Sequence, residues 1–246
     1  MKLVLFDIDG TLLDSGGAGT RALDLAFSEV YSITEAFRGI RMAGKTDTEI
    51  IGEALLRHGI DRSDEASPAL TRVYLKYLAL EIKNDRKRLK PGVEETLERL
   101  GSQPGVRLGL LTGNIEGGAE IKIGAFGLER HFLPKNGAGG EPGRLLGAFG
   151  SDNADRNLLL PIAVRKLAED CGKTVSFADC VVVGDTPRDI NCARPYGARA
   201  VGVATGPYSL EDLRAAGADL VISDLAQGSG HLDALLAEGR DLSPSS

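Results

Sequence analysis

The sequence is poor in the residues that mark disulfide-rich, zinc-binding and membrane proteins. Only three of its 246 residues are cysteine and none is tryptophan. The cysteines, Cys171, Cys180 and Cys192, have no C-x-x-C spacing and no neighbouring histidine pair, which disfavours both a disulfide framework and a zinc site. No apolar run approaches the roughly 18 residues of a membrane-spanning helix, and the run at the start is too short for a signal peptide. We therefore expect a soluble, cytoplasmic protein with no membrane partner.

An excess of positive charge is also missing. The chain has 29 Lys and Arg against 35 Asp and Glu, a net charge of −6. Because phosphate backbones favour clustered cations, we do not expect nucleic acid as a partner. The length and the 42% hydrophobic content suit one large domain, or a core with a smaller domain. They do not distinguish a monomer from a homodimer.

Short apolar runs that end at polar residues recur along the chain, as expected for strands buried on both faces. The runs cover residues 3–6, 106–112, 180–185, 198–203 and 218–223, with a weaker one at 145–150. Helical periodicity separates most of them. This alternation predicts an α/β fold with a doubly wound, mostly parallel sheet, a Rossmann-like core.

The segment from residue 15 to residue 90 breaks this alternation. It has no buried-strand run, and it contains three helical patterns, at residues 20–31, 46–59 and 67–84. Turn-rich sequence borders it on both sides. We therefore predict an all-helical domain at residues 15–90, inserted into an α/β core made of residues 1–14 and 91–246.

Acidic and hydroxyl side chains follow three of the predicted strands. Because the carboxyl ends of parallel strands gather ligands, these residues should meet at one edge of the sheet. They are Asp7, Asp9, Gly10 and Thr11; Thr112, Gly113 and Asn114; and Asp185 and Asp189. Crowded carboxylates need a counter-ion, and Mg²⁺ prefers oxygen ligands and phosphate. The pattern predicts phosphoryl transfer, with one aspartate free to attack phosphorus.

The segments FDIDGTLLDS, LLTGN and VVVGDTPRDINCARPYGARAVGV resemble the haloacid dehalogenase-like hydrolases over nearly the whole chain. The nearest resemblance is to the phosphoglycolate phosphatase-like branch, whose helical cap lies between the first and second motifs. It implies an Mg²⁺-dependent phosphatase that acts on a small phosphorylated metabolite. The alternatives are a phosphomutase acting on a sugar phosphate and a non-catalytic aspartate phospho-receiver.

The resemblance also implies a role for each motif residue. Asp7 would be the nucleophile, and Asp9 would be the general acid and base. Thr112 and Asn114 would orient the phosphoryl oxygens, with Gly10, Thr11 and Gly113 beside them. The metal ligands would be Asp7, the backbone carbonyl of Asp9, Asp185 and Asp189.

One family residue is absent. The third motif usually supplies a lysine 20 to 30 residues before the Gly-Asp pair, often followed by proline. No Lys-Pro stands there, and the candidates are Arg156 and Lys166. We favour Arg156 as the catalytic cation, because Lys166 lies inside a helical pattern.

The segment RMAGKTD of the predicted insert would face the substrate through Arg41, Lys45, Thr46 and Asp47. Lys45 or Arg41 would bind a substrate carboxylate or a second phosphate. Thr46 can also cap a helix, with Glu49 completing a capping box. Two glycine-rich stretches are weaker candidates. Residues 17–22 match a dinucleotide-binding pattern but do not follow a strand directly, and residues 134–147 are expected to be a mobile surface loop.

Overall fold

A computed structural model describes residues 1–62, 67–133 and 144–237 of the chain. Most of the glycine-rich stretch at residues 134–147 lies outside the described residues. Within the described ranges, no helix has the length and apolar character needed to cross a membrane.

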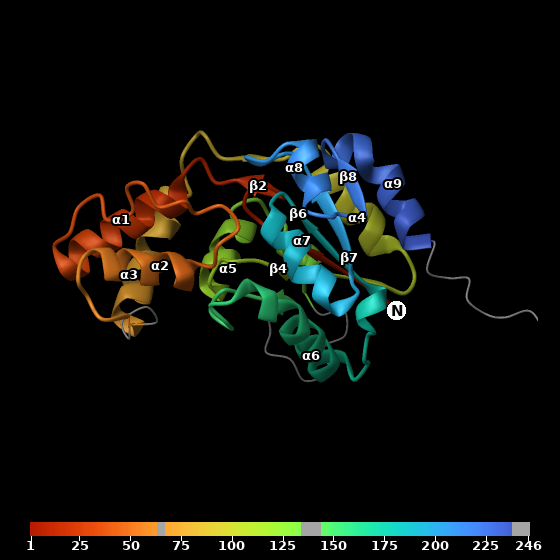
Figure 1. The fold of residues 1–246 in the computed structure, drawn as a ribbon, viewed down its shortest axis with the longest axis horizontal. Helices are drawn as coiled ribbons and strands as arrows, with labels where there is room; N and C mark the ends of the chain where they lie inside the picture. The colour runs from red at the N-terminus through yellow and green to blue at the C-terminus, as the bar shows by residue number, and fades with distance from the viewer. Residues whose placement is uncertain (63–66, 134–143, 238–246) are drawn as a thin grey trace, which may run out of the picture.

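A six-stranded sheet forms the centre of the molecule (Figure 1). Its strand order is β5-β4-β1-β6-β7-β8, and all five pairings are parallel. This confirms the predicted fold class and places the strands that carry the motifs, β4, β1 and β6, side by side. The strands are β1 (Lys2–Phe6), β4 (Val106–Leu111), β5 (Gly147–Ala148), β6 (Cys180–Gly184), β7 (Arg199–Val203) and β8 (Leu220–Ile222).

The side chains of β1 alternate between two hydrophobic layers, as the period of two of a strand requires. Leu3 and Leu5 pack with α6, α7 and α8, while Val4 and Phe6 pack with α4, α5 and α9 on the other face. The sheet is therefore covered on both faces, which explains its continuous apolar runs. These helices are α4 (Val93–Ser102), α5 (Glu116–Gly124), α6 (Leu159–Cys171), α7 (Pro187–Ala193), α8 (Leu210–Ala215) and α9 (Leu225–Ala237).

Three helices lie beyond the carboxyl edge of the sheet and pack around a separate hydrophobic core, which also includes Ile115 at the start of α5. They are α1 (Ala18–Tyr31), α2 (Asp47–Arg57) and α3 (Pro68–Glu81). Phe27, Leu55 and Tyr74 are among the fully buried side chains of this core. Below, residues 15–90 are called the insert.

The chain leaves the sheet for the insert and returns from it at neighbouring positions. There β2 (Leu13–Asp14) pairs antiparallel with β3 (Arg88–Leu89). The two connections therefore lie side by side, next to the end of β1. This arrangement places the beginning of the insert, from Ser15 to Gly17, near Asp7 and Asp9.

Candidate active site

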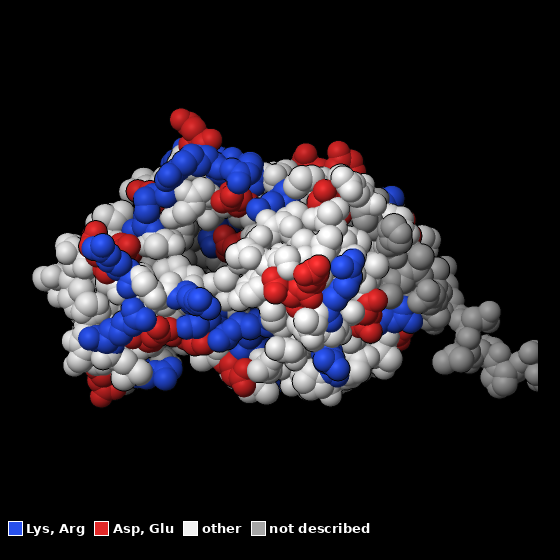
Figure 2. All heavy atoms as spheres, turned by 45° about the horizontal axis from the view of Figure 1, so that its top comes forward, with Lys and Arg blue, Asp and Glu red and all other residues white. Residues whose placement is uncertain are grey.

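The motif residues surround a cavity of about 410 Å³ between the sheet edge and the insert. Figure 2 shows the molecule hollowed between these two parts, with charged atoms at the bottom of the hollow. Asp7, Thr112 and Asp185 directly follow β1, β4 and β6, so three adjacent strands each place a polar residue at the same edge of the sheet. All three residues line the cavity and are buried.

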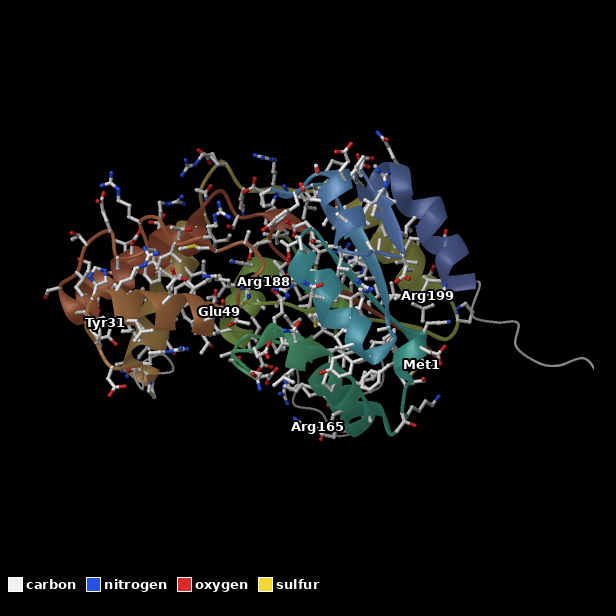
Figure 3. All side chains as sticks on the ribbon, in the orientation of Figure 1. Met1, Tyr31, Glu49, Arg165, Arg188 and Arg199 are labelled. Atoms are coloured by element: carbon white, nitrogen blue, oxygen red, sulfur yellow. The ribbon has the colours of Figure 1, made fainter. Side chains whose placement is uncertain are left out.

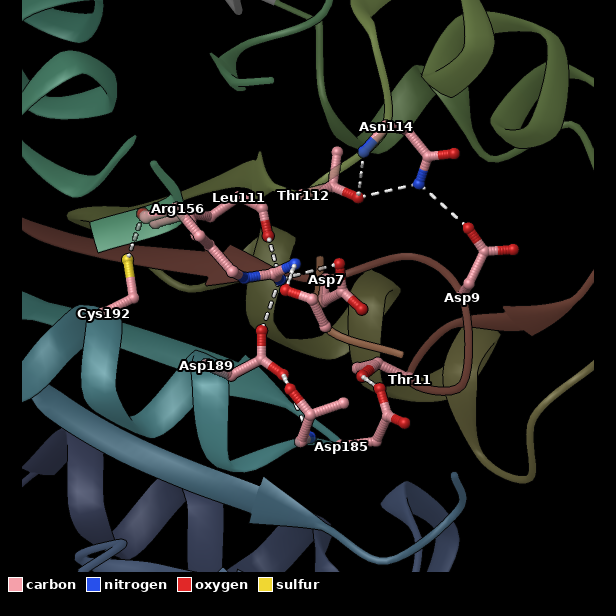
Figure 4. A network of polar contacts seen from close by, with 12 residues as sticks. Asp7, Asp9, Thr11, Leu111, Thr112, Asn114, Arg156, Asp185, Asp189 and Cys192 are labelled. Atoms are coloured by element: carbon pink, nitrogen blue, oxygen red, sulfur yellow. Dashed lines mark hydrogen bonds and ion pairs between the residues drawn. The ribbon is translucent and has the colours of Figure 1, made fainter. Parts of the chain in front are cut away.

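Three carboxylates, two of which line the cavity, form a compact cluster. Each of Asp7, Asp185 and Asp189 offers one oxygen within 4.8 Å of the others. Arg156 lies against this cluster and is 3% exposed. Its Nη2 donates to Asp7 Oδ1 at 3.0 Å and also to Asp189 Oδ1 (Figure 4). The arginine expected in the place of the family lysine therefore contacts the expected nucleophile.

Burial dominates the electrostatics of this cluster. It raises the pKa of Asp7 to about 6, although the Arg156 guanidinium opposes the shift. Burial, followed by the charges of Asp7 and Asp189, also raises the pKa of Asp185 well above its usual value. One guanidinium thus compensates three buried carboxylates only in part, and the cluster favours a second cation.

The hydrogen bonds indicate which of these carboxylates fit a metal ion. Both oxygens of Asp189 are engaged, Oδ1 by Arg156 and Oδ2 by the backbone and hydroxyl of Thr186 at the start of α7. Thr11 donates to Asp185 Oδ1 at 3.0 Å. Among the described residues, Asp7 Oδ2 and Asp185 Oδ2 accept no hydrogen bond. Two carboxylate oxygens of this kind, on residues that line the cavity, suit Mg²⁺, which usually takes one or two carboxylates together with water and phosphate.

Asp9 lies apart from this cluster. Its Oδ2 accepts hydrogen bonds from Asn114 Nδ2 at 2.9 Å and from Lys122 Nζ at 2.5 Å. Burial alone would raise the pKa of Asp9, but the charge and hydrogen bond of Lys122 lower it, helped by Asn114. The side chain of Asp9 thus points to Asn114 and Lys122 and not to the three clustered carboxylates.

The second motif forms a compact turn after β4. Asn114 donates to Thr112 Oγ1 from both its backbone nitrogen, at 3.3 Å, and its side chain, at 2.9 Å. Gly113 passes so close to the insert that a Cβ there would lie 2.1 Å from the carbonyl oxygen of Lys45. Gly10 has φ of +90° and lies against Asp185, where a Cβ would also clash. Gly113 is therefore required by the close approach of the Lys45 backbone, and Gly10 by its positive φ and by the Asp185 carboxylate beside it.

The residues predicted in the insert separate into two groups. Lys45 and Asp47 line the cavity, whereas Arg41 does not. The Lys45 ammonium is bound by Glu53 and lies 3.9 Å from Glu49. Its charge is therefore already paired with acids of α2, which weakens the expectation that Lys45 binds an anionic substrate group.

The start of α2 joins the insert to the core. Thr46 Oγ1 accepts from the backbone nitrogen of Glu49, which confirms the predicted cap, and donates to the carbonyl of Ala154. The Glu49 carboxylate does not complete the predicted capping box. It instead accepts two hydrogen bonds from Arg188 of α7, at 2.7 and 3.1 Å, and Figure 3 shows the two side chains directed toward each other.

Asp47 adds two hydrogen bonds to the contact between the insert and the core. Its backbone nitrogen donates to the carbonyl of Gly113 at 2.7 Å, and its Oδ2 accepts from the backbone nitrogen of Ile115 at 3.0 Å. Thr48 donates to the carbonyl of Gly150. Residues 46–49 thus bind the core loops that carry Asn114 and Arg156.

Lys166, the alternative to Arg156, lies elsewhere. Its Nζ donates to both oxygens of Asp152, each at 2.7 Å. It does not line the cavity. Between the two candidates, only Arg156 reaches Asp7.

Sequence reasoning missed Lys122, which lines the cavity and is 4% exposed. A signal was present. Ile115, Gly118, Ala119 and Lys122 follow the i, i+3, i+4, i+7 spacing of one buried helix face. This face is otherwise made of small and apolar residues and is buried. A lysine on it therefore needs acidic partners inside the protein.

Residues 1–197 match the family haloacid dehalogenase-like hydrolase. The chain belongs to this family. It is 29% identical to a phosphoglycolate phosphatase of Rhodospirillum rubrum, over 92% of this chain and 88% of the relative. It is 28% identical to the probable phosphatase IndB of Dickeya dadantii, over 95% and 94% of the two chains. A hydrolase from Pseudomonas syringae has the same fold, with a TM-score of 0.65, 24% identity and coverage of 95% and 99%.

Proposed function

We propose that this hydrolase is an Mg²⁺-dependent phosphatase that hydrolyses a small phosphate monoester through an aspartyl-phosphate at Asp7. The main support is the placement of Asp7 and Asp185, each with a carboxylate oxygen that accepts no hydrogen bond among the described residues, beside Arg156 in a cavity of about 410 Å³. Two relatives are named as phosphatases.

In the first step, one oxygen of the Asp7 carboxylate attacks phosphorus, and Arg156 orients that carboxylate. The bond from phosphorus to the leaving oxygen breaks, and Asp9 transfers a proton to that oxygen. In the second step, Asp9 removes a proton from a water molecule, which attacks phosphorus and releases phosphate from Asp7. Thr112 and the backbone of Asn114 orient the phosphoryl oxygens.

Mg²⁺ held by Asp7 and Asp185 would neutralise phosphoryl charge when bound. We propose that residues 15–90 act as a cap that covers the cavity and excludes water during the first step. Arg156 would supply the cation of the missing family lysine. In its planar guanidinium, Nη2 donates to both Asp7 and Asp189. Nη1 donates to the carbonyl of Gly44 in the insert at 3.3 Å.

A steady-state assay of phosphate release tests the proposal. Phosphoglycolate is the first substrate to try, because relatives are named for it, and p-nitrophenyl phosphate serves as a generic ester. We expect release that requires Mg²⁺, is suppressed reversibly by EDTA, and is abolished in Asp7→Asn. Isomerisation of a sugar phosphate without phosphate release would favour the mutase instead, and full activity of Asp7→Asn would contradict the nucleophile assignment.

A further inference from the structure

The insert contributes an apolar wall to the cavity. Leu23, Met42, Ile50 and Tyr74 line the cavity, and they belong to the hydrophobic core of the insert or pack against it. Leu23, Ile50 and Tyr74 are at most 4% exposed, so the packing of that core fixes their positions. These four side chains are called the insert wall below.

A short series of contacts leads from Asp9 to the insert wall. Lys122 Nζ donates to Asp9 Oδ2 at 2.5 Å. A Cβ at Gly19 would lie 3.5 Å from Lys122 Nζ and 4.0 Å from the Tyr74 hydroxyl, so these two side chains meet at the first turn of α1. If Asp9 protonates the leaving oxygen, as the proposed function requires, the atoms that follow this oxygen lie toward the insert wall.

The cations nearest to this wall are already paired with acids. The Lys122 ammonium is bound by Asp9, and the charges of both Asp9 and Asp47 raise its pKa. The Lys45 ammonium is bound by Glu53. Both ammonium charges are thus balanced within the protein, before any substrate enters.

Two other positive features of the cavity do not serve the insert wall. The start of α1 lines the cavity, but Asp14 supplies a carboxylate there, and its Oδ1 accepts from the backbone just before this helix at 2.9 Å. Lys90 donates to the carbonyl of Thr205 at 2.7 Å, and the Thr205 hydroxyl donates to the carbonyl of Gly10, which packs against Asp185. Lys90 therefore lies on the side of the proposed metal and phosphoryl group.

Negative charge is disfavoured beside the insert wall. Burial raises the pKa of Asp47 and raises the pKa of Tyr74 well above its usual value. The charges of Asp47 and Asp9 raise the pKa of Tyr74 further, while Lys122 opposes the rise at Asp47. A carboxylate on the leaving group would lose its water here without gaining a free cation.

We propose that the insert wall selects phosphate monoesters whose leaving group is uncharged and apolar, an alkyl or aryl alcohol, and that it disfavours a carboxylate on that group. Covering apolar atoms of the substrate with apolar side chains removes both from water. The inference rests on the proposed function and assigns it a class of substrate. Phosphoglycolate, for which several relatives are named, should therefore be a poor substrate of this chain.

Three esters of one shape test the selection against charge. Phosphoglycolate, its amide and isobutyl phosphate have the same arrangement of non-hydrogen atoms, and only phosphoglycolate has a charged leaving group. With Mg²⁺, we expect kcat/KM for isobutyl phosphate to exceed that for phosphoglycolate by at least about tenfold, with the amide between them. A ratio of one or below refutes the proposal, and so does an amide as slow as phosphoglycolate.

A series of alkyl esters tests the apolar contact by itself. From ethyl to propyl to butyl phosphate, kcat/KM should rise about three- to fourfold for each added methylene, the effect of burying it. A series without this rise shows that the leaving group does not contact the insert wall, which overturns the assignment.

Met42 allows the selectivity to be changed, because it is the partly buried member of the insert wall. Met42→Lys adds a cation to the wall and should raise kcat/KM for phosphoglycolate relative to isobutyl phosphate by at least about tenfold. Leu80→Lys is the matched control, because it adds the same charge at an exposed position of the insert that does not line the cavity. An equal change in both variants, or no change in Met42→Lys, overturns the assignment.

Two further measurements keep the test decisive. Ala43→Lys, at an exposed residue that also lines the cavity, replaces Met42→Lys if the latter does not fold. Hydrolysis of p-nitrophenyl phosphate by the wild type tests the phosphatase itself. Hydrolysis of this ester together with a preference for phosphoglycolate over isobutyl phosphate refutes only the role of the insert wall, whereas absence of all hydrolysis refutes the proposed function.

Discussion

Arg156 Nη2 lies 3.0 Å from Asp7 Oδ1 and donates at the same time to Asp189, inside a core where all three side chains are at most 7% exposed. Arg156 is in the short 3₁₀ turn before α6, Asp7 follows β1, and Asp189 lies in α7. One guanidinium therefore ties together three segments that are far apart in the sequence. Its loss should affect both turnover and stability.

Arg156→Ala should lower kcat/KM by about 10²- to 10³-fold, because Asp7 and the phosphoryl group lose a positioned cation. It should also lower the free energy of unfolding by ~3–5 kcal/mol, because two buried carboxylates lose their partner. Urea unfolding and initial rates measure the two effects. Lys166→Ala is the control, since its pair with Asp152 lies outside the cavity, and equal losses in the two variants would contradict the assignment.

The contact between Glu49 and Arg188 should affect the position of the insert over the cavity more than the free energy of unfolding. Both side chains are about one-third or more exposed, so Glu49→Gln should cost less than ~1 kcal/mol of unfolding free energy. If the contact helps residues 46–49 to hold the insert over the cavity, KM should rise several-fold with little change in kcat. A double-mutant cycle with Arg188→Gln measures the coupling, and additive effects on KM would refute it.

Gly113 should not tolerate a side chain. A Cβ there would lie 2.1 Å from the carbonyl oxygen of Lys45, so Gly113→Ala must push the insert away from the second motif. We expect a loss of activity of at least tenfold with the fold retained, as judged by circular dichroism. Gly124→Ala, whose Cβ would meet no atom within 4 Å, is the matched control, and a fully active Gly113→Ala would contradict the tight contact.

Stabilisation by Mg²⁺ should depend on pH. Burial raises the pKa of Asp7 to about 6 from the ordinary 3.8, so in the metal-free protein its stability contribution is greatest below about 4 and is lost as pH rises through about 6. Mg²⁺ binds the ionised carboxylates, and protons compete with it. Thermal unfolding should therefore show a larger rise in Tm on adding Mg²⁺ at pH 7.5 than at pH 5.

Asp185→Asn supplies the control for this measurement, because it removes one of the two carboxylates that fit the metal. Its Tm should respond little to Mg²⁺ at either pH. An equal Mg²⁺ response of the wild type at both pH values would contradict a site built on Asp7 and Asp185.

The strands and motif positions were predictable because they depend on local patterns. Leu3–Phe6 is apolar at every position, and Asp7 follows at once, so both the buried strand and its functional end can be read directly. The parallel sheet then places Asp7, Thr112 and Asp185 at one edge without further information. Thr46 was predictable as a helix cap for the same local reason.

Side-chain pairing across the chain was not predictable in the same way. Glu49 had two possible partners, the start of its own helix and a distant cation, and only the tertiary structure, which brings the start of α2 near Arg188, selects the arginine. Lys45 was expected to be free for substrate, but Glu53 lies two turns along the same side of α2 and binds it. Lys122 was overlooked because its partners, Asp9 and Asn114, come from other strand ends.

The most direct test of the central claim is to trap the phosphorylated protein. A single-turnover reaction with ³²P-labelled phosphoglycolate or another labelled monoester is quenched in acid and digested. We predict that label appears transiently on the peptide containing Asp7, is released by hydroxylamine, and is absent in Asp7→Asn. Turnover of the same ester with no label on that peptide at any time would contradict an aspartyl-phosphate mechanism.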